Sequence, residues 1–273
     1  MNLTKIKEVC AKAGIVPSKI LGQNFLVDEN VVNKIISEAN IENTETILEV
    51  GPGVGVLTGE ILKRAQKVIA VELDIKVLNF LRAEFFNEKN LQLVEKNILK
   101  ANRLELGFEN FRYKIISNLP YNITSKFLRL FLEQEPRPYE MILMVQKEVA
   151  QRIVAKVGEM SLLSLSCQFY AEPELLFIVN KKSFWPEPKI DSAVIRLKLK
   201  ENVDKNQAEG MFRVARMGFS SRRKQLHNNL SAGLKITSEE AKTVIKSLGF
   251  DEKIRAQDLS VKNWIGLAEA LKH

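Results

Sequence analysis

The chain is poor in the residues that build disulfide frameworks and metal centres. Its two cysteines, Cys10 and Cys167, are far apart in the sequence and supply neither a disulfide framework nor a cysteine metal site. Its two histidines, His227 and His273, are too few for a histidine metal site. We therefore expect no bound metal, and the sparse cysteines are typical of a protein in a reducing cytoplasm.

Long apolar segments are also missing. No apolar run approaches the ~20 residues that a helix needs to cross a bilayer. Residues 1–12 contain lysines but neither the apolar stretch nor the cleavage site of a signal peptide. These absences predict a cytoplasmic protein with no membrane partner. At 273 residues, 45% of them hydrophobic, the chain is long enough to bury a sizeable core.

Negative charge is in the minority. The 33 acidic residues are outnumbered by 41 lysines and arginines, which gives a formal net charge of +8 and a sequence pI near 9.3. Excess positive charge favours anionic partners, of which nucleic acids are the commonest. Small anionic ligands are an alternative, because many basic enzymes bind them.

Strands and helices are predicted to alternate through the first 200 residues. Apolar runs predict strands at 46–51, 67–74, 91–97, 112–118 and 139–147. Helical spacing appears at 56–65, 75–86, 123–134, 148–156 and 161–170. This alternation predicts an α/β domain with a mostly parallel sheet and helices on both faces. Two later strands, at 175–180 and 191–200, are expected to close the sheet edge as an antiparallel hairpin.

The pattern changes after Lys200. A polar, linker-like stretch at 201–207 precedes short helical patterns at 208–219, 222–232, 238–247 and 260–271. Ser260 is placed to cap the last of these helices. We therefore expect a catalytic α/β domain over residues 1–200 and a small all-α domain over residues 201–273.

The segment "LEVGPGVG" (48–55) follows the first predicted strand and opens a helix. Its glycines let the backbone turn tightly and approach a ligand. A dinucleotide site needs a glycine where Val56 stands, so the loop is poorly suited to bind a pyrophosphate. The loop alone is almost equally compatible with a plain turn, but its E-x-G-x-G-x-G form resembles the first motif of S-adenosylmethionine (SAM)-dependent methyltransferases.

Two polar residues end the next two predicted strands. Glu72 ends the second strand, where a carboxylate can accept hydrogen bonds from both hydroxyls of a ribose. Asn97 follows the third strand, where the methyltransferase pattern usually has an acid that bonds an adenine amino group. An amide carbonyl can accept that bond without the assistance of a charge.

The turn "SNLPY" (117–121) ends the fourth predicted strand. An adenine amine is a poor nucleophile until its two N–H hydrogens are accepted, and Asn118 with the backbone carbonyl of Leu119 can accept them. Pro120 would fix the backbone, and Tyr121 could stack on the base, a contact worth roughly 1–3 kcal/mol. In isolation this segment is a plain turn. In this position it resembles the [DN]-P-P-[YFW] motif of amine methyltransferases, and Leu119 matches the rRNA rather than the DNA type.

Six segments in order carry a wider resemblance, at 21–36, 48–58, 116–125, 144–153, 183–197 and 220–230. They are similar to the bacterial small-subunit (16S) rRNA adenine-N6,N6-dimethyltransferases over nearly the whole chain. The resemblance implies a Rossmann-like SAM-dependent methyltransferase that modifies two adjacent adenines near the 3′ end of small-subunit rRNA. Its implied partner is the small-subunit rRNA in a pre-30S ribosomal particle, and we expect it to act as a monomer.

The resemblance also assigns roles to individual residues. Phe184 would hold the target base against Tyr121. The implied SAM contacts are Asn24, Leu26, Gly51, Gly53, Glu72, Asn97 and Asn118. Without the resemblance, the segment "GQNFL" is a helix-entry loop with Asp28 as the cap of the helix.

Residues 211–224 form a basic stretch without an acid. We interpret it as a basic helix that contacts RNA phosphates, although such a face is often merely solvated. Its cations are Arg213, Arg216, Arg222, Arg223 and Lys224. The "HNNL" that follows, at 227–230, either contacts RNA or caps a helix.

Two other functions compete with the leading one. An antibiotic-resistance enzyme that methylates a large-subunit rRNA adenine would share the cofactor motifs, but "QKEVAQR" and "RRKQLHNNL" fit the small-subunit group better. A non-catalytic RNA- or DNA-binding factor could keep the fold. Intact Asn118, Pro120 and Tyr121 argue against that loss of chemistry, and Asn97 leaves it open.

Overall fold

The computed structural model describes residues 2–18 and 20–271, so His273 lies outside the described residues. The chain divides into two compact units, of which the first comprises Met1–Ala150 and Pro173–Leu199 and the second comprises Gln151–Glu172 and Lys200–His273. The sequence boundary near residue 200 leaves 151–172 in the first domain, whereas the structure groups that segment with the second. The reason is aromatic packing, because Phe169 and Tyr170 both lie against Phe212.

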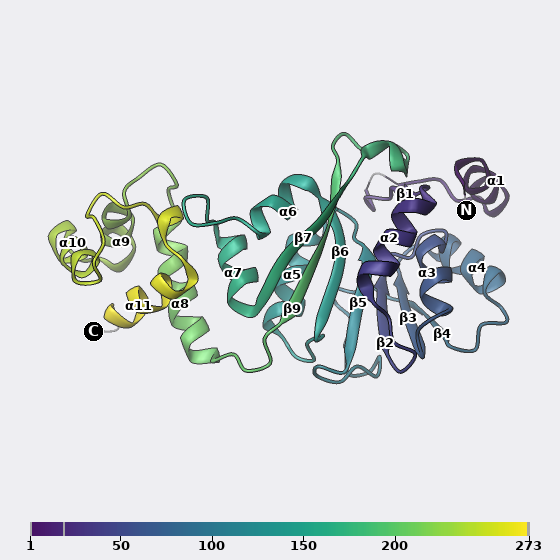
Figure 1. The fold of residues 1–273 in the computed structure, drawn as a ribbon, viewed down its shortest axis with the longest axis horizontal. Helices are drawn as coiled ribbons and strands as arrows, with labels where there is room; N and C mark the ends of the chain where they lie inside the picture. Colours follow the sequence, from purple (N-terminus) through teal and green to yellow (C-terminus); the bar gives the residue numbers. More distant parts are fainter. Residues whose placement is uncertain (1, 19, 272–273) are drawn as a thin grey trace. The chain divides into compact units, whose positions relative to one another are not determined.

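A seven-stranded sheet forms the core of the first unit, in the order β4-β3-β2-β5-β6-β9-β7 (Figure 1). Its strands are β2 (Thr46–Val50), β3 (Lys67–Glu72), β4 (Leu91–Glu95), β5 (Tyr113–Asn118), β6 (Glu140–Gln146), β7 (Ala171–Val179) and β9 (Ser192–Leu199). Strands β2 to β6 pair in parallel, and β9 pairs antiparallel with β6. The two late strands are neighbours at the edge of the sheet, as the sequence predicts, with β9 on the inner side.

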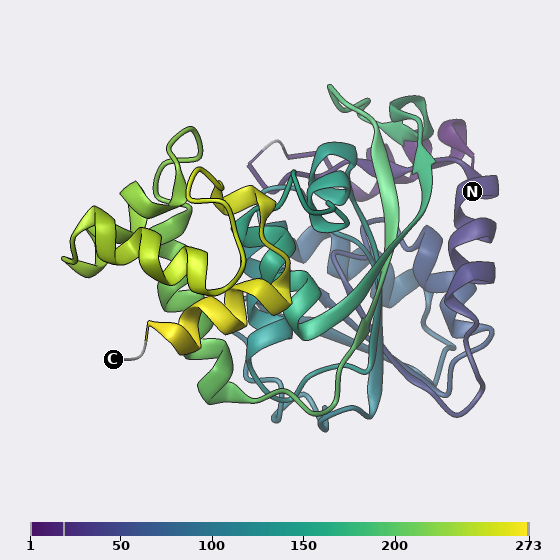
Figure 2. The same ribbon diagram turned by 60° about the vertical axis from the view of Figure 1, so that its left-hand side comes forward.

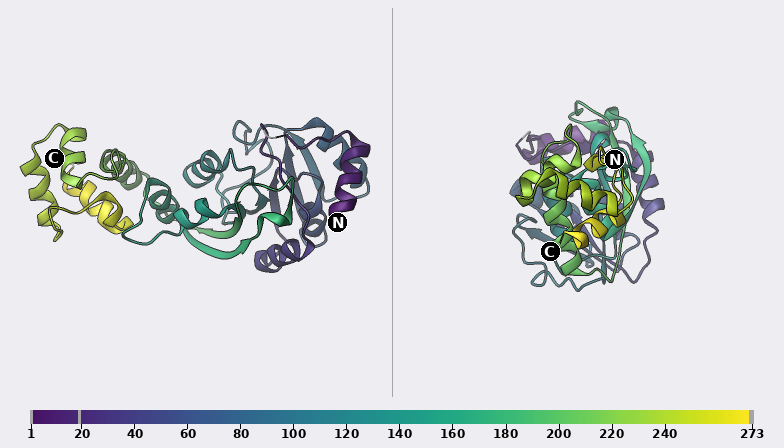
Figure 3. Two further views of the ribbon diagram at one scale, coloured as in Figure 1. Left: turned by 90° about the horizontal axis from the view of Figure 1, so that it is seen from above. Right: turned by 90° about the vertical axis from the view of Figure 1, so that its left-hand side faces the viewer.

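Helices lie on both sides of this sheet when it is seen from above (Figure 3). They are α1 (Leu3–Ala13), α2 (Glu29–Ala39), α3 (Val56–Leu62), α4 (Ile75–Glu84), α5 (Thr124–Glu133) and α6 (Lys147–Ile153). The α/β class is therefore confirmed. Asp28 caps α2 by accepting a hydrogen bond from the Asn30 N–H at 3.0 Å, as in the alternative interpretation of "GQNFL" as a helix-entry loop. Helix α1 was not predicted, and it buries Ile6, Val9 and Cys10.

A short two-stranded ribbon stands apart from the main sheet. Strand β1 (Phe25–Leu26) pairs antiparallel with β8 (Phe184–Trp185), which the 3₁₀ helix η1 (Lys181–Ser183) precedes. The hydroxyl of Ser183 donates to the Asp28 carboxylate at 2.9 Å and fastens the two segments further. The ribbon thus joins two sequence motifs that are far apart in the chain.

The second unit is helical (Figure 2). It contains α7 (Leu162–Tyr170), α8 (Lys205–Gly218), α9 (Leu226–Leu234), α10 (Ser238–Ser247), the 3₁₀ helix η2 (Ala256–Asp258) and α11 (Val261–Ala270). Ser260 caps α11, as expected, by accepting a hydrogen bond from the Asn263 N–H at 3.2 Å. In the parts of the chain that the structure describes, no helix is long and apolar enough to span a bilayer.

One sequence interpretation of this unit is wrong. The basic stretch 211–224 is not one helix, because α8 ends at Gly218 and residues 222–224 lie in the loop before α9. The helix ends there because the buried side chain of Asn229 takes up the carbonyl oxygens of Gly218 and Ser221. Only Arg213 and Arg216 of the predicted cations are helical.

Candidate active site

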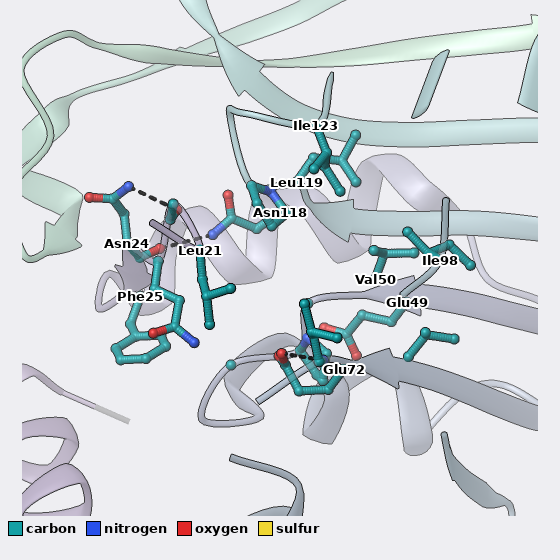
Figure 4. Close-up of a pocket in the computed structure, with 18 of the residues that line it drawn as sticks. Leu21, Asn24, Phe25, Glu49, Val50, Glu72, Ile98, Asn118, Leu119 and Ile123 are labelled. Carbon is teal, nitrogen blue, oxygen red and sulfur yellow. Dashed lines mark hydrogen bonds between the residues drawn. The ribbon is translucent and has the colours of Figure 1, made fainter. Parts of the chain in front are cut away.

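A pocket of about 260 Å³ lies at the carboxyl ends of β2, β3 and β5 (Figure 4). The chain runs from β2 to β3 on one side and returns to β5 on the other, and ligands of open α/β sheets bind at such a switch point. The pocket lining includes every residue that the sequence assigned to the cofactor, namely Asn24, Leu26, Gly51, Gly53, Glu72, Asn97 and Asn118.

The glycine loop between β2 and α3 forms one wall of the pocket. Gly53 has a φ of 56°, and a Cβ there would lie 2.9 Å from the ring of Phe25. Gly55 has a φ of 78°, and its Cβ would lie 2.6 Å from the ring of Phe85 at the end of α4. Gly55 therefore serves the close packing of the loop against α4, which explains why its spacing does not suit a phosphate cradle.

Glu72 ends β3 at the pocket wall. Its Oε1 accepts hydrogen bonds from the backbone N–H groups of Leu73 at 2.7 Å and Asp74 at 2.9 Å. Burial raises the pKa of this carboxyl, and the two backbone donors partly offset that effect because they favour the charged form. The carboxyl is thus held in one orientation at the place where the sequence predicts a ribose contact.

Glu49 is a pocket residue to which the sequence assigned no role of its own. Its side chain is 1% exposed, and no described residue bonds its Oε2. Burial raises its pKa to about 8, the nearby Thr58 hydroxyl partly offsets this, and the charge of Glu72 adds to it. The sequence signal for a role of Glu49 was its place as the acid that opens the E-x-G-x-G-x-G motif. A cation in the pocket would favour the ionised form of this carboxyl.

Asn97 lies in the turn after β4. Its Oδ1 accepts a hydrogen bond from the Leu99 N–H at 3.0 Å, so the amide oxygen is engaged within its own turn. A carbonyl oxygen has a second lone pair, and the predicted contact with an adenine amino group remains available to it.

Asn118 ends β5 and is oriented from the opposite side of the pocket. Its Nδ2 donates to the backbone carbonyl of Asn24 at 3.2 Å, which turns Oδ1 away from that carbonyl (Figure 4). The Ser117 hydroxyl donates to the Val50 carbonyl at 2.7 Å and ties the ends of β5 and β2 together. The amide oxygen of Asn118 is therefore presented as an acceptor on a rigid strand end.

The backbone carbonyls of Leu119 and Pro120 differ in their hydrogen bonding. The Leu119 N–H donates to the Met144 carbonyl at 3.2 Å, whereas no described residue donates a hydrogen bond to the Leu119 carbonyl. The Pro120 carbonyl accepts a hydrogen bond from the Ile123 N–H at 3.2 Å, which closes the turn. The carbonyl of Leu119 and Oδ1 of Asn118 are thus among the oxygens of the turn to which no described residue donates.

The two aromatic residues predicted to hold the base occupy different environments. Tyr121 lines the pocket, and its hydroxyl shares a hydrogen bond of 2.6 Å with the Ser192 hydroxyl at the start of β9. Burial raises the pKa of the Tyr121 phenol. Phe184 does not line the pocket: it pairs with Leu26, is only 4% exposed and belongs to the hydrophobic core. Its role as the second wall beside the base stays a prediction.

The predicted RNA contacts are all exposed in the second unit. They are Arg213 and Arg216 on α8, and Arg222, Arg223 and Lys224 in the loop that follows. Exposed side chains of one sign are free to meet phosphates. Among the described residues there is no group of His, Cys, Asp and Glu side chains that could hold a metal ion.

The parallel sheet, its glycine loop and the acid that ends β3 define a Rossmann-like methyltransferase fold. Residues 18–273 match the family described as ribosomal RNA adenine dimethylase, and the chain belongs to this family. The family predicted from the sequence is confirmed.

Two relatives and two solved structures illustrate the match. The ribosomal RNA small subunit methyltransferase A of Dehalococcoides mccartyi is 42% identical and covers 96% of this chain and 91% of its own. That of Bacillus mycoides is 37% identical, with coverages of 98% and 95%. A dimethyladenosine transferase from Plasmodium falciparum superposes with a TM-score of 0.77 at 26% identity, covering 89% and 95% of the two chains. The 23S rRNA methyltransferase ErmE shares the fold, with a TM-score of 0.73 at 24% identity. The match covers 92% of this chain and 100% of that chain.

Proposed function

We propose that this protein is a SAM-dependent enzyme that dimethylates the N6 amines of two adjacent adenines near the 3′ end of small-subunit rRNA. The observation that carries the proposal is the orientation of Asn118, whose amide is fixed by the Asn24 carbonyl so that its oxygen is left to accept. The names of the relatives support the small-subunit substrate, because both are small-subunit enzymes.

The pocket residues fit SAM as the cofactor. SAM supplies an electrophilic methyl group on a positively charged sulfur and also carries an ammonium. The buried Glu49 carboxyl has an unbonded oxygen in the pocket that can compensate positive charge. Glu72 would hold the ribose hydroxyls and Asn97 the adenine amino group, with Asn24 and Leu26 beside the ligand and the Gly51 to Gly53 backbone beneath it.

The chemistry assigned to this chain is the preparation of the amine. Oδ1 of Asn118 and the Leu119 carbonyl would accept the two N–H hydrogens, which draws the nitrogen towards tetrahedral geometry and frees its lone pair. No general base is required first, since the amine loses its proton as or after the methyl arrives. Tyr121, anchored through Ser192, would stack on the base and align it.

The exposed cations of the second unit would hold the RNA. Arg213, Arg216 and residues 222–224 supply positive charge for the phosphate backbone. An enzyme that acts on a base must take it out of its stack, and phosphate contacts elsewhere help to compensate that cost. We propose that the enzyme acts as a cytoplasmic monomer on a small-subunit precursor.

Methylation of purified small and large ribosomal subunits with labelled SAM tests the proposal. We expect label on the small subunit only, and mass spectrometry should locate N6,N6-dimethyladenosine at two adjacent positions. Label on the large subunit alone would establish the antibiotic-resistance type of activity. RNA binding without any transfer would establish a non-catalytic factor.

A further inference from the structure

The loop between α8 and α9, residues 219–225, carries the densest positive charge of the predicted RNA contacts. We name it the basic loop. Arg222, Arg223 and Lys224 are all exposed on it. Loops with exposed charged tips are usually mobile, because few contacts hold their backbones. The basic loop differs, since side chains from the following helix hold both of its ends.

Asn229 holds the first end. This residue is 3% exposed, and its Nδ2 donates to the Gly218 carbonyl at 2.6 Å and to the Ser221 carbonyl at 2.9 Å. The Ser221 carbonyl also accepts the Lys224 N–H at 3.2 Å, which closes a turn around the two arginines. One buried amide therefore fixes both the end of α8 and the start of the turn.

His227 holds the second end. It is 7% exposed, and its Nε2 hydrogen bonds to Oε1 of Gln225 at 2.8 Å. Its Nδ1 hydrogen bonds to the hydroxyl of Ser238, the first residue of α10, at 2.9 Å. The Leu226 N–H donates to the Ile254 carbonyl at 2.8 Å and adds a third attachment at this end. Gln225, the last residue of the basic loop, is thus bonded to His227, which is itself held by α10.

We infer that Asn229 and His227 are positioning residues that hold the basic loop in one conformation for the phosphate backbone of the rRNA. The inference rests on the proposed function. Neither side chain reaches RNA itself, because both are buried, and Nδ2 of Asn229 and both ring nitrogens of His227 form hydrogen bonds within the second unit. A loop that is ordered before binding does not lose its conformational entropy when RNA arrives. The "HNNL" segment therefore contributes to RNA binding by positioning the basic loop and not by contacting RNA.

The test compares Asn229→Ala with Asn228→Ala, which removes the same amide from the exposed neighbouring position. If the loop then holds its binding conformation about a tenth of the time, the KM for the small subunit rises about tenfold. The kcat at saturating subunit and the Kd for SAM stay unchanged. Limited trypsin digestion should also cleave faster after Arg222, Arg223 and Lys224 in Asn229→Ala than in Asn228→Ala.

A second variant, His227→Ala, removes the hydrogen bond to Gln225 at the other end of the loop and keeps the test valid if Asn229→Ala fails to fold. It should raise KM in the same way with kcat unchanged. If either variant lowers kcat instead of raising KM, or leaves both KM and tryptic cleavage unchanged, the positioning role is overturned.

Joint replacement of Arg222 and Arg223 by alanine separates this inference from the proposed function. A higher KM in that double variant, with Asn229→Ala like its control, rejects the positioning role alone. An unchanged KM in the double variant rejects the loop as an RNA contact, and with it the inference.

Discussion

Asn118 and Asn229 are two asparagines whose amide nitrogens fix a backbone turn, one in each unit, and they differ in what surrounds their side chains. Asn118 donates one hydrogen bond to the Asn24 carbonyl and keeps its oxygen for the pocket. Asn229 is buried and donates to two carbonyls of the basic loop. An amide that lines a pocket can do chemistry at a fixed position, whereas one that is buried against two backbone carbonyls can only position its neighbours.

The largest effect that would test this comparison comes from Asn118→Ala. We expect methyl transfer to fall by roughly 100- to 1000-fold, as when a preorganised hydrogen-bonding group is removed from an active site. RNA binding should be largely kept, because the basic residues are untouched. Single-turnover transfer with labelled SAM measures the first quantity and a filter-binding assay the second. Undiminished turnover would show that Asn118 has no chemical role.

Glu49 tests the pocket side of the comparison through the pH dependence of the free energy of unfolding. Its pKa of about 8 in the folded protein lies above the ordinary value of 4.5, so folding favours the protonated form. The stabilisation is complete below pH 4.5 and is lost as pH rises towards 8, at ~1.4 kcal/mol per unit of pKa difference. The free energy of unfolding should therefore decline between pH 5 and 8 more steeply in the wild type than in Glu49→Gln. Urea titrations at several pH values measure it, and parallel curves would contradict the assignment.

Neutralising Arg222 and Arg223 tests the RNA side. We expect RNA affinity to fall and the slope of log K against log salt to flatten by about 1–2, since each phosphate contact contributes roughly 0.7–0.9. A matched control replaces Lys63 and Arg64, which are exposed in the first unit and paired with Glu60. The control removes the same charge and should change the slope less. Equal slopes in the two double variants would show that the loop makes no specific phosphate contact.

The smallest expected effect is an increase in the affinity for SAM. Asn97→Asp would add charge to the proposed bond with the adenine amino group of SAM and should tighten SAM binding about threefold to tenfold. Asn97→Leu, which removes the acceptor, should weaken binding. Isothermal titration of SAM into each variant measures the two changes. Weaker binding by the aspartate variant would place Asn97 outside the adenine contact.

Much of the fold followed from periodicity. The strands from Thr46 to Gln146 were each predicted within a few residues, because buried parallel strands are continuous apolar runs. The amphipathic helix α1 was not predicted, since its buried face consists only of Ile6, Val9 and Cys10. A helix end near residue 219 was predicted, but the next helix was expected from residue 222, because a run of arginines is compatible with a helix, and it begins only at Leu226. The side chain that holds the end of α8 lies eleven positions further on.

The sequence by itself determined the class, the family and several of the pocket residues, because glycines, strand-end acids and the "SNLPY" turn carry their chemistry in their identity and spacing. Only the tertiary structure decided how each side chain is used. It buried Phe184 in the pairing of β1 with β8, raised the pKa of Glu49 by burial, and fixed the amide nitrogen of Asn118 on the Asn24 carbonyl. Register, burial and hydrogen-bond partners depend on segments far apart in the chain, and local sequence does not encode them.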